Sequence, residues 1–568
     1  MLNLIPKVKR IEFFEGKLSK KAIFFNDSVN DDRLRRAISL LPSAENGAPL
    51  NIENGDSGDG YEIWINAEGI KIKGDGPEGV FYAIQTLRQI FNHPEVPYLY
   101  VKDKPDFKYR GFYHDVTRGK VPTVARVKQL IDQMAFFKLN SLQLYVEHTY
   151  EFEETKDIIQ KTGYLTSEEL KEIGAYCKEN FIEFIPSLST FGHLFELLNQ
   201  DKFKHLRVLG DYEAKPNRWL DRMEHHTIAP LKEESFEVVK SLIDQYLPNF
   251  QSDYFNICCD ETFDLIKVYG QDAAKLYVDF VKKIIAYLQS KDKKIMMWAD
   301  ILLTHPETIS ELPEDVCFLN WRYRTNPDEE QFAKLGEMGR KQIVCPGTTV
   351  WNRFCEQLSV LESNITKVID FGNKHGAVGV LNTSWGDYGH TCSLELTMYG
   401  MTFGAAKSWD LSTATGDEFD ACVDLQLYKH SGAMATLREL SALSETVSYR
   451  NFVLSHFAED RTALPADIAE VLKADIGDLQ KAYLSLCERL SAEKWELDDY
   501  RVEMMVAAEA ICLVAELYSL REGKIFDRVT DTEDWLKKYR ARWMLNNKES
   551  ELSRIENFFK TCETEYKK

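Results

Sequence analysis

The sequence predicts an α/β fold: a (β/α)8 barrel (a TIM barrel) with a small N-terminal α/β domain and a helical C-terminal domain. Between about residues 108 and 405, short apolar runs alternate with helix-length segments, as in a barrel of parallel strands. Acids and tryptophans recur where these runs end, and the runs disappear beyond about Asp410. We expect domains at 1–103, 104–408 and 409–568.

The first hundred residues are typical of a small α/β domain. Tyr61 to Gly74 alternates apolar and polar residues around Asn66-Ala67-Glu68-Gly69, which predicts a hairpin with glycine at a positive φ. Gly76 to Phe91 has apolar residues at a helical period. We interpret Val101 to Asp106, which contains a proline, as the linker to the barrel.

The central region supplies one apolar run for each barrel strand. An open doubly wound sheet is the alternative, but no glycine-rich phosphate loop follows any run, so the barrel is favoured. Thr166 and Glu169 form a capping-box signature for one intervening helix. The expected strands are Gly111–Val116, Ser141–Val146, Ile182–Leu188, the run beginning at Tyr254, Lys294–Trp298, Val316–Trp321, Gln342–Pro346 and Val378–Trp385.

The C-terminal region contains long segments compatible with helices, such as Asp467 to Leu490 and Tyr500 to Arg521. We expect these helices to pack on the barrel or on a partner subunit, and a homodimer is one possibility.

Charge and composition limit the partners. The net charge is −20, from 70 basic and 90 acidic residues, which argues against a nucleic acid or an anionic membrane. No run of about eighteen apolar residues predicts a membrane span, and the first residues lack the apolar core of a secretory signal. Eleven cysteines without CxxC pairs fit a reducing cytoplasm, although a chain trimmed of a signal would look the same.

The stretch YFNICCDETFD, Tyr254 to Asp264, is the strongest functional signal. Its apolar run ends in adjacent carboxylates, Asp260 and Glu261, which would be costly to bury without partners or a role in a cleft. A surface acid pair that begins a helix is the alternative. On an extended chain the two side chains would point to opposite faces, one into the barrel mouth and one over the cleft.

Other strand ends add side chains that suit a sugar pocket. Aromatic walls fit the faces of a sugar ring, and charged groups bind its hydroxyls. The candidate binding residues are Arg118, Glu147, His193, Trp298, Trp321, Trp351, Asn352, Trp385 and Asp387.

Over roughly residues 60 to 400 the sequence resembles glycoside hydrolase family 20, the β-N-acetylhexosaminidases, most specifically at CCDETF. The resemblance implies that Glu261 is the general acid/base and that Asp260 orients the 2-acetamido group. It also implies that Arg118 holds the O3 and O4 hydroxyls. The tryptophans expected to enclose the acetamido methyl and the ring are Trp298, Trp321 and Trp385.

The implied activity is exo-acting and retaining: removal of terminal β-linked GlcNAc or GalNAc from an oligosaccharide or glycoconjugate. Two acids adjacent on one strand are poorly placed to flank a glycosidic bond from both sides, whereas they suit attack at C1 by the substrate's own acetamido oxygen. We expect their proximity to raise the pKa of Glu261.

Several positions depart from the family pattern. Ser189 stands where an acidic partner of His193 is usual, and Asp387 stands where the family usually has glutamate. Trp351-Asn352 replaces a Tyr-x-Asp motif, which leaves the donor to the acetamido carbonyl unassigned. The second strand ends in Glu147-His148, where acids are more typical.

Two other functions remain as alternatives. A metal-dependent barrel hydrolase could use His193, His225, His226 and the acids, but no HxH or HExxH spacing is present, so we expect no metal and no other cofactor. A lectin-like barrel that binds amino sugars without cleaving them would have lost the general acid, whereas Glu261 is present.

Overall fold

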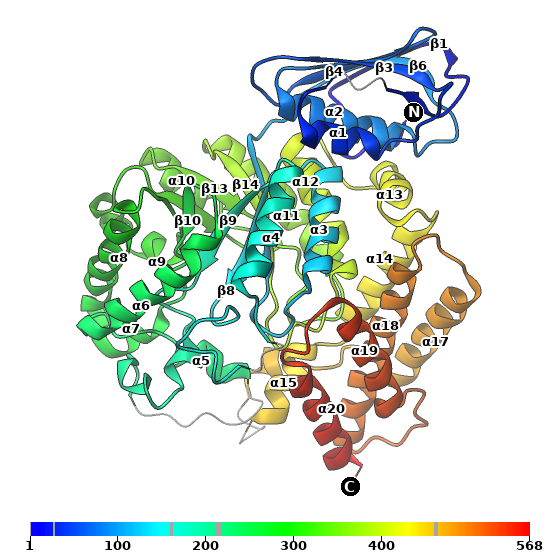
Figure 1. Cartoon of the computed structure of the whole chain (residues 1–568). Coiled ribbons are helices and arrows are strands. Elements are labelled where there is room, and N and C mark those ends of the chain that lie inside the picture. The colour runs from blue at the N-terminus through cyan, green and yellow to red at the C-terminus, as the bar shows by residue number, and fades with distance from the viewer. Residues whose placement is uncertain (1, 26–28, 160–162, 211–218, 459–463, 568) are drawn as a thin grey trace.

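The computed structural model describes residues 2–25, 29–159, 163–210, 219–458 and 464–567. Figure 1 shows a small sheet with two helices at one end of a barrel and a group of helices along the side of the barrel. This is the fold predicted from the sequence.

The N-terminal sheet has the order β1-β6-β4-β5-β3-β2, and β4 and β5 form the predicted hairpin, with Gly69 at φ 136°. The interpretation of Val101 to Asp106 as a linker is wrong for its first half, because β6 extends to Asp103 and pairs with β1 and β4. Leu99, Val101 and Asp103 alternate into the core, a strand pattern. The elements are β1 Arg10–Lys17, β2 Ile23–Phe24, α1 Asp32–Ser39, β3 Ala48–Asn54, β4 Tyr61–Asn66, β5 Gly69–Gly74, α2 Pro77–Ile90 and β6 Pro97–Asp103.

Each of the predicted central runs forms a strand, and within the described residues these strands close a parallel barrel in the order β10-β11-β12-β13-β14-β7-β8-β9. They are buried on both faces because one face fills the barrel and the other packs under helices. The strands are β7 Tyr109–Asp115, β8 Ser141–Val146, β9 Glu183–Leu188, β10 Tyr254–Asn256, β11 Lys294–Trp298, β12 Cys317–Trp321, β13 Gln342–Cys345 and β14 Gly379–Ser384.

Helices cover the outside of the barrel. The capping box at the start of α4 is present: Thr166 Oγ1 accepts the Glu169 N–H at 3.2 Å, and Glu169 Oε2 accepts the Thr166 N–H at 2.8 Å. The covering and connecting helices are α3 Val124–Phe136, α4 Ser167–Glu179, α5 Phe195–Leu198, α6 Glu233–Tyr246, α7 Phe263–Tyr269, α8 Ala273–Gln289, α9 Asp300–Thr304, α10 Glu330–Glu337, α11 Leu358–Lys374 and α12 Met398–Trp409.

The C-terminal helices pack on the barrel, which is one of the two arrangements that we expected. Tyr539 donates to the Thr391 carbonyl at 3.3 Å, and Arg126 of α3 pairs with Glu395 at 2.6 Å beside Asn546. The predicted helix from Asp467 to Leu490 is broken into two. The helices are α13 Asp417–Val423, α14 Ala433–Glu445, α15 Tyr449–Phe457, α16 Ala466–Ala469, α17 Ile476–Ala492, α18 Asp498–Arg521, α19 Thr532–Asn546 and α20 Leu552–Tyr566.

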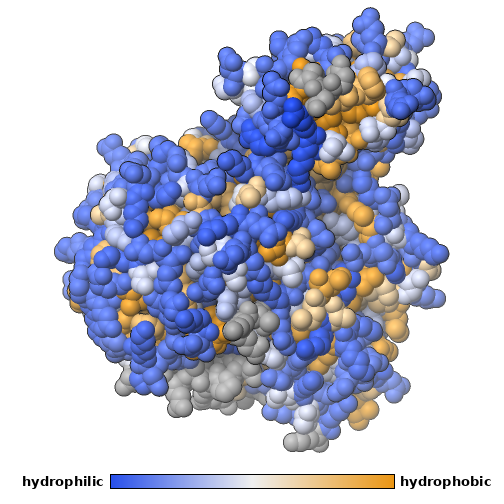
Figure 2. Space-filling model, viewed as in Figure 1, coloured by the Kyte–Doolittle hydropathy of each residue, from blue (hydrophilic) through white to orange (hydrophobic). Residues whose placement is uncertain are grey.

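The surface in Figure 2 is predominantly hydrophilic, with scattered apolar patches, in keeping with the high charge of the chain. None of the helices in the described part of the chain combines the length and apolar character needed to cross a membrane.

Candidate active site

The two adjacent carboxylates lie beyond β10 rather than on it. The strand ends at Asn256, and Cys258, Cys259 and Glu261 have left-handed φ values of 56°, 65° and 50°. The expectation that an extended chain would point Asp260 and Glu261 to opposite faces is therefore wrong. The backbone turns, and both carboxylates converge on one imidazole.

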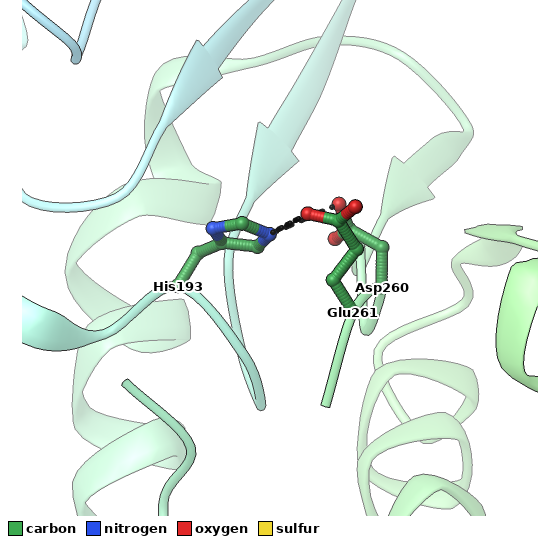
Figure 3. Close-up of side chains that lie close together, drawn as sticks. All are labelled: His193, Asp260 and Glu261. Atoms are coloured by element: carbon green, nitrogen blue, oxygen red, sulfur yellow. Dashed lines mark ion pairs between the residues drawn. The ribbon is translucent and has the colours of Figure 1, made fainter. Parts of the chain in front are cut away.

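That imidazole belongs to His193. Its Nε2 atom lies 3.4 Å from Asp260 Oδ2 and 3.3 Å from Glu261 Oε2 (Figure 3). Gly192 makes the approach possible, because a Cβ there would meet the Asp260 carbonyl at 2.4 Å. Burial lowers the pKa of His193, but the charges of Asp260 and Glu261 outweigh it and raise that pKa well above its usual value. The two neighbouring carboxyl groups therefore favour the protonated form of the imidazole.

Neighbouring side chains hold His193 in this position. His226 Nδ1 accepts the His193 backbone N–H at 2.7 Å, and its loop is fixed by Asp264, which accepts the His226 N–H at 3.0 Å. Glu147 Oε1 lies 3.8 Å from His193 Nδ1 and accepts the Tyr145 hydroxyl at 2.8 Å. Glu147 thus takes the acidic position beside His193 that Ser189 leaves empty.

Arg118 lies between two further acids of the site. Its Nε donates to Asp115 Oδ2 at 2.6 Å, and its Nη1 donates to Asp387 Oδ1. Burial raises the pKa of Asp115, but the Arg118 guanidinium more than offsets this and lowers that pKa to about 2. The first and last strands of the barrel thereby hold a rigid guanidinium with a carboxylate beside it, a pair that can bind vicinal hydroxyls.

Aromatic rings form the wall between β12 and β14. Trp321 and Tyr323 stack at 5.0 Å, Tyr323 packs against Trp351 at 5.0 Å, and the Trp385 indole N–H donates to the Tyr323 hydroxyl at 2.8 Å. Sequence reasoning missed Tyr323. The available signal was its spacing: it lies two residues after Trp321, so the two share a face if the chain stays extended.

These groups line a cavity of about 460 Å³, a volume suited to a small ligand. Eight predicted residues line it. They are Arg118, His193, Asp260, Glu261, Trp321, Trp351, Trp385 and Asp387.

The structure does not bring the other three predicted residues into the cavity wall. Glu147 lies behind His193. Trp298 is fully buried in the barrel interior, 5.2 Å from the Tyr113 ring and 5.7 Å from Trp385. Asn352 occupies a left-handed turn position at φ 63°, which asparagine tolerates. Trp298 therefore does not contact a ligand in the cavity, but its ring packs against Trp385, which does line the cavity.

Asp300, at the start of α9, follows a predicted strand, but the sequence analysis assigned it no role. Its Oδ2 accepts the Glu261 backbone N–H at 3.0 Å and so fixes the left-handed turn. Burial and the nearby Asp260 charge raise the pKa of Asp300 to about 7. We predicted such a rise for Glu261 rather than for this neighbour.

Further unpredicted cavity residues come from three segments outside the barrel strands. The short helix η2 (Trp219–Met223) contributes Trp219, Arg222 and Met223, the loop after β14 contributes Tyr388, and α15 contributes Arg450. The sequence offers no signal for them, because only the folded chain brings α15 to the barrel mouth.

Comparison with known proteins agrees with this architecture. The model for glycosyl hydrolase family 20, catalytic domain, matches residues 107–368, and the model for domain 2 of the same family matches residues 2–104. A beta-hexosaminidase of Porphyromonas gingivalis is 28% identical over 329 residues, 51% of this chain and 40% of that protein. Hexosaminidase D of Bos taurus is 24% identical over 302 residues, 48% of this chain and 83% of that protein. The match thus spans well under half the length of the bacterial relative.

Solved structures share the fold. A β-N-acetylhexosaminidase from Bacteroides fragilis superposes with a TM-score of 0.59 at 18% identity, over 74% of this chain and 94% of that one. A Vibrio harveyi exo-β-N-acetylglucosaminidase of the same family gives 0.59 at 17% identity, over 75% and 77%. Since two models of one family match in succession from residue 2 to residue 368, the chain belongs to glycosyl hydrolase family 20.

Proposed function

We propose that the protein is an exo-acting, retaining β-N-acetylhexosaminidase that removes terminal β-linked N-acetylhexosamine with help from the substrate's own acetamido group. Glu261 is the general acid/base, and Asp260 holds the acetamido N–H while the carbonyl oxygen attacks C1. Membership of the family supports the reaction class, and the hexosaminidase names of its relatives support the substrate class.

The observation that carries the mechanism is the convergence of Asp260 and Glu261 on His193 Nε2. A retaining enzyme with its own carboxylate nucleophile needs two acids on opposite sides of the scissile bond, about 5 Å apart. Acids that meet on one nitrogen approach the sugar from one side. The nucleophile then has to come from the substrate. The acetamido group on C2 carries a carbonyl oxygen that can reach C1.

The remaining groups position the sugar. Arg118 and Asp387 bind hydroxyls of the sugar, and Trp321 and Trp385 enclose the acetamido methyl. Tyr323 is the donor to the acetamido carbonyl, which the sequence left unassigned. Its hydroxyl accepts the Trp385 N–H, which leaves its own proton available to that carbonyl. The His193 imidazole holds both carboxyl groups in position.

Hydrolysis of 4-nitrophenyl N-acetyl-β-glucosaminide, followed by NMR, tests this function. We expect release of β-GlcNAc as the first product, loss of activity in Glu261→Gln, and no action on chains capped at the non-reducing end. Release of internal fragments would contradict the exo assignment. Sugar binding without turnover would favour the lectin-like alternative.

One observation favours a second candidate, a metal-dependent hydrolase. Within the described residues, one ligand atom each of His193, Asp260 and Glu261 lies within 4.8 Å of the others, a spacing that could hold a metal ion. The family models and the hexosaminidase relatives support a glycosidase instead. The glycosidase is therefore the function that we propose.

We also propose a cytoplasmic location. All eleven cysteines are free thiols and ten of them are buried, which supports a reducing compartment. The homodimer and the domain boundaries remain predictions, and light scattering and limited proteolysis would test them.

A further inference from the structure

One wall of the cavity is built by elements outside the barrel. Trp219, at the start of the short helix η2 (Trp219–Met223), and Arg450, on α15, both line the cavity. Both segments rest on Phe558 of α20: its ring lies 5.5 Å from Trp219 and 6.4 Å from Tyr449, the neighbour of Arg450. The C-terminal helices thus contribute Arg450 to the site, and this residue lies beyond the segment matched by the family models, which ends at residue 368.

Arg450 differs from the other cations of the cavity because no carboxylate in the described part of the chain pairs with it. Arg118 is held by two aspartates, and Arg222 pairs with Glu196 at 2.6 Å and with Glu551. Among the described residues, no carboxylate lies within 4.0 Å of Arg450, whose Nη1 has one weak contact with Asn451 Oδ1 at 3.4 Å. A chain with 90 acidic and 70 basic residues has no shortage of acids to pair with it.

A second donor on the same wall is also unsatisfied. Trp219 is 4% exposed, and its buried indole nitrogen, which can only donate, has no hydrogen-bond partner among the described groups. Tyr388 lies close to Arg450: burial raises the pKa of the Tyr388 hydroxyl, and the guanidinium opposes that rise. Arg450 is also hydrogen-bonded to the Tyr388 hydroxyl, which is neutral and supplies no charge. Among the described residues, the wall therefore presents a half-exposed cation without a carboxylate partner and a buried N–H without an acceptor.

A substrate that fills the cavity would displace water from Arg450 and Trp219. A neutral sugar would remove water from Arg450 without supplying a charge, and an unpaired desolvated charge is costly. An anionic oxygen would compensate the guanidinium and accept from Trp219 as well. We propose that Arg450 and Trp219 form a subsite for an anionic group, a sulfate ester or a carboxylate, carried by the glycoside substrate.

This inference rests on the proposed function and specifies its substrate class. The charge could be on the terminal N-acetylhexosamine or on the sugar that leaves. Two pairs of probes distinguish these sources. The first pair is 4-nitrophenyl N-acetyl-β-glucosaminide with and without a 6-O-sulfate. The second is N-acetylglucosaminyl-β-1,4-glucuronic acid and N-acetylglucosaminyl-β-1,4-glucose.

In at least one pair, we expect the wild-type kcat/KM to be about 10- to 100-fold higher for the anionic member, the usual effect of a charge-assisted hydrogen bond. Arg450→Gln should bring this ratio close to one, Arg450→Lys should keep part of it, and Trp219→Phe should reduce it. The ratio should also fall as salt is added. Arg540→Gln, which removes a surface arginine paired with Glu556, is the matched control and should keep the full ratio.

A ratio of one or less in both pairs, or a preference that survives Arg450→Gln, would overturn the inference. If the neutral probes are cleaved and the ratios are one, the subsite fails and the proposed function stands. If no probe is cleaved, calorimetric titration of both pairs into the Glu261→Gln variant still decides the inference. Equal affinity for the charged and neutral members would then reject it.

Discussion

The indole N–H of Trp385 donates to the hydroxyl of Tyr323 at 2.8 Å, which links the loop after β14 to the end of β12 across the aromatic wall. Because Tyr323 accepts this bond, its own proton can point into the cavity.

We predict that Tyr323→Phe lowers kcat more than it raises KM on N-acetyl substrates, by about 0.5–1.5 kcal/mol of transition-state stabilisation, the usual worth of a neutral hydrogen bond. The lost bond orients the group that attacks C1. Tyr109→Phe, which removes a hydroxyl at the opposite end of the barrel, is the control and should leave kcat unchanged. An effect on KM alone would assign Tyr323 to binding only.

Arg118→Ala should cost on the order of 1.5–3 kcal/mol in kcat/KM, because a charge-assisted bond to the sugar hydroxyls is lost. Arg118→Lys should recover only part of this, since an ammonium cannot present the fork that Asp115 and Asp387 hold in place. Wild-type kinetics in Arg118→Ala would show that the sugar lies elsewhere in the cavity.

Asp300 should make stability depend on pH. Its pKa of about 7 in the folded protein lies above the ordinary value of 3.8, so between these pH values the folded state holds a proton that the unfolded chain has released. Stability from this group is therefore greatest near pH 4 and decreases as the pH rises to 7. Asp300→Asn has no such proton, so urea unfolding should show wild type losing stability relative to the variant across this window. A constant difference would contradict the prediction.

Metal removal by dialysis against a chelator should leave kcat unchanged, since the proposed reaction uses Asp260, Glu261 and the acetamido group of the substrate, and no step needs a metal. Activity that is lost on dialysis and restored by zinc or calcium would instead favour the metal-dependent hydrolase, with His193, Asp260 and Glu261 as ligands.

The barrel could be predicted from sequence because each strand is a short apolar run that must be buried on both faces. The turn after β10 could not: left-handed φ values at Cys258, Cys259 and Glu261 leave no mark in residue type, since none of these is glycine. The same limit applies to β6, which looked like a linker because Pro105 follows it closely.

Some site residues could likewise be predicted from the sequence, and others could not. Strand-end positions such as Arg118 and Trp385 were predictable, because parallel strands bring their carboxyl ends together. Trp298 was placed in the cavity because strand position alone does not tell how deep a side chain lies. Arg450 could not be predicted, because only the packing of α15 against α20 carries it to the barrel mouth.

The division of labour between Asp260 and Glu261 is the central claim, and a leaving-group series measured on both variants tests it most directly. Glu261→Gln should slow natural sugar leaving groups by roughly 10²–10⁴-fold but activated aryl glycosides much less, since these depart without a proton. Asp260→Asn should slow all substrates by similar factors and weaken binding of a cyclic thiazoline that mimics the oxazolinium intermediate. Equal leaving-group slopes for the two variants, or unchanged thiazoline affinity in Asp260→Asn, would contradict the assignment.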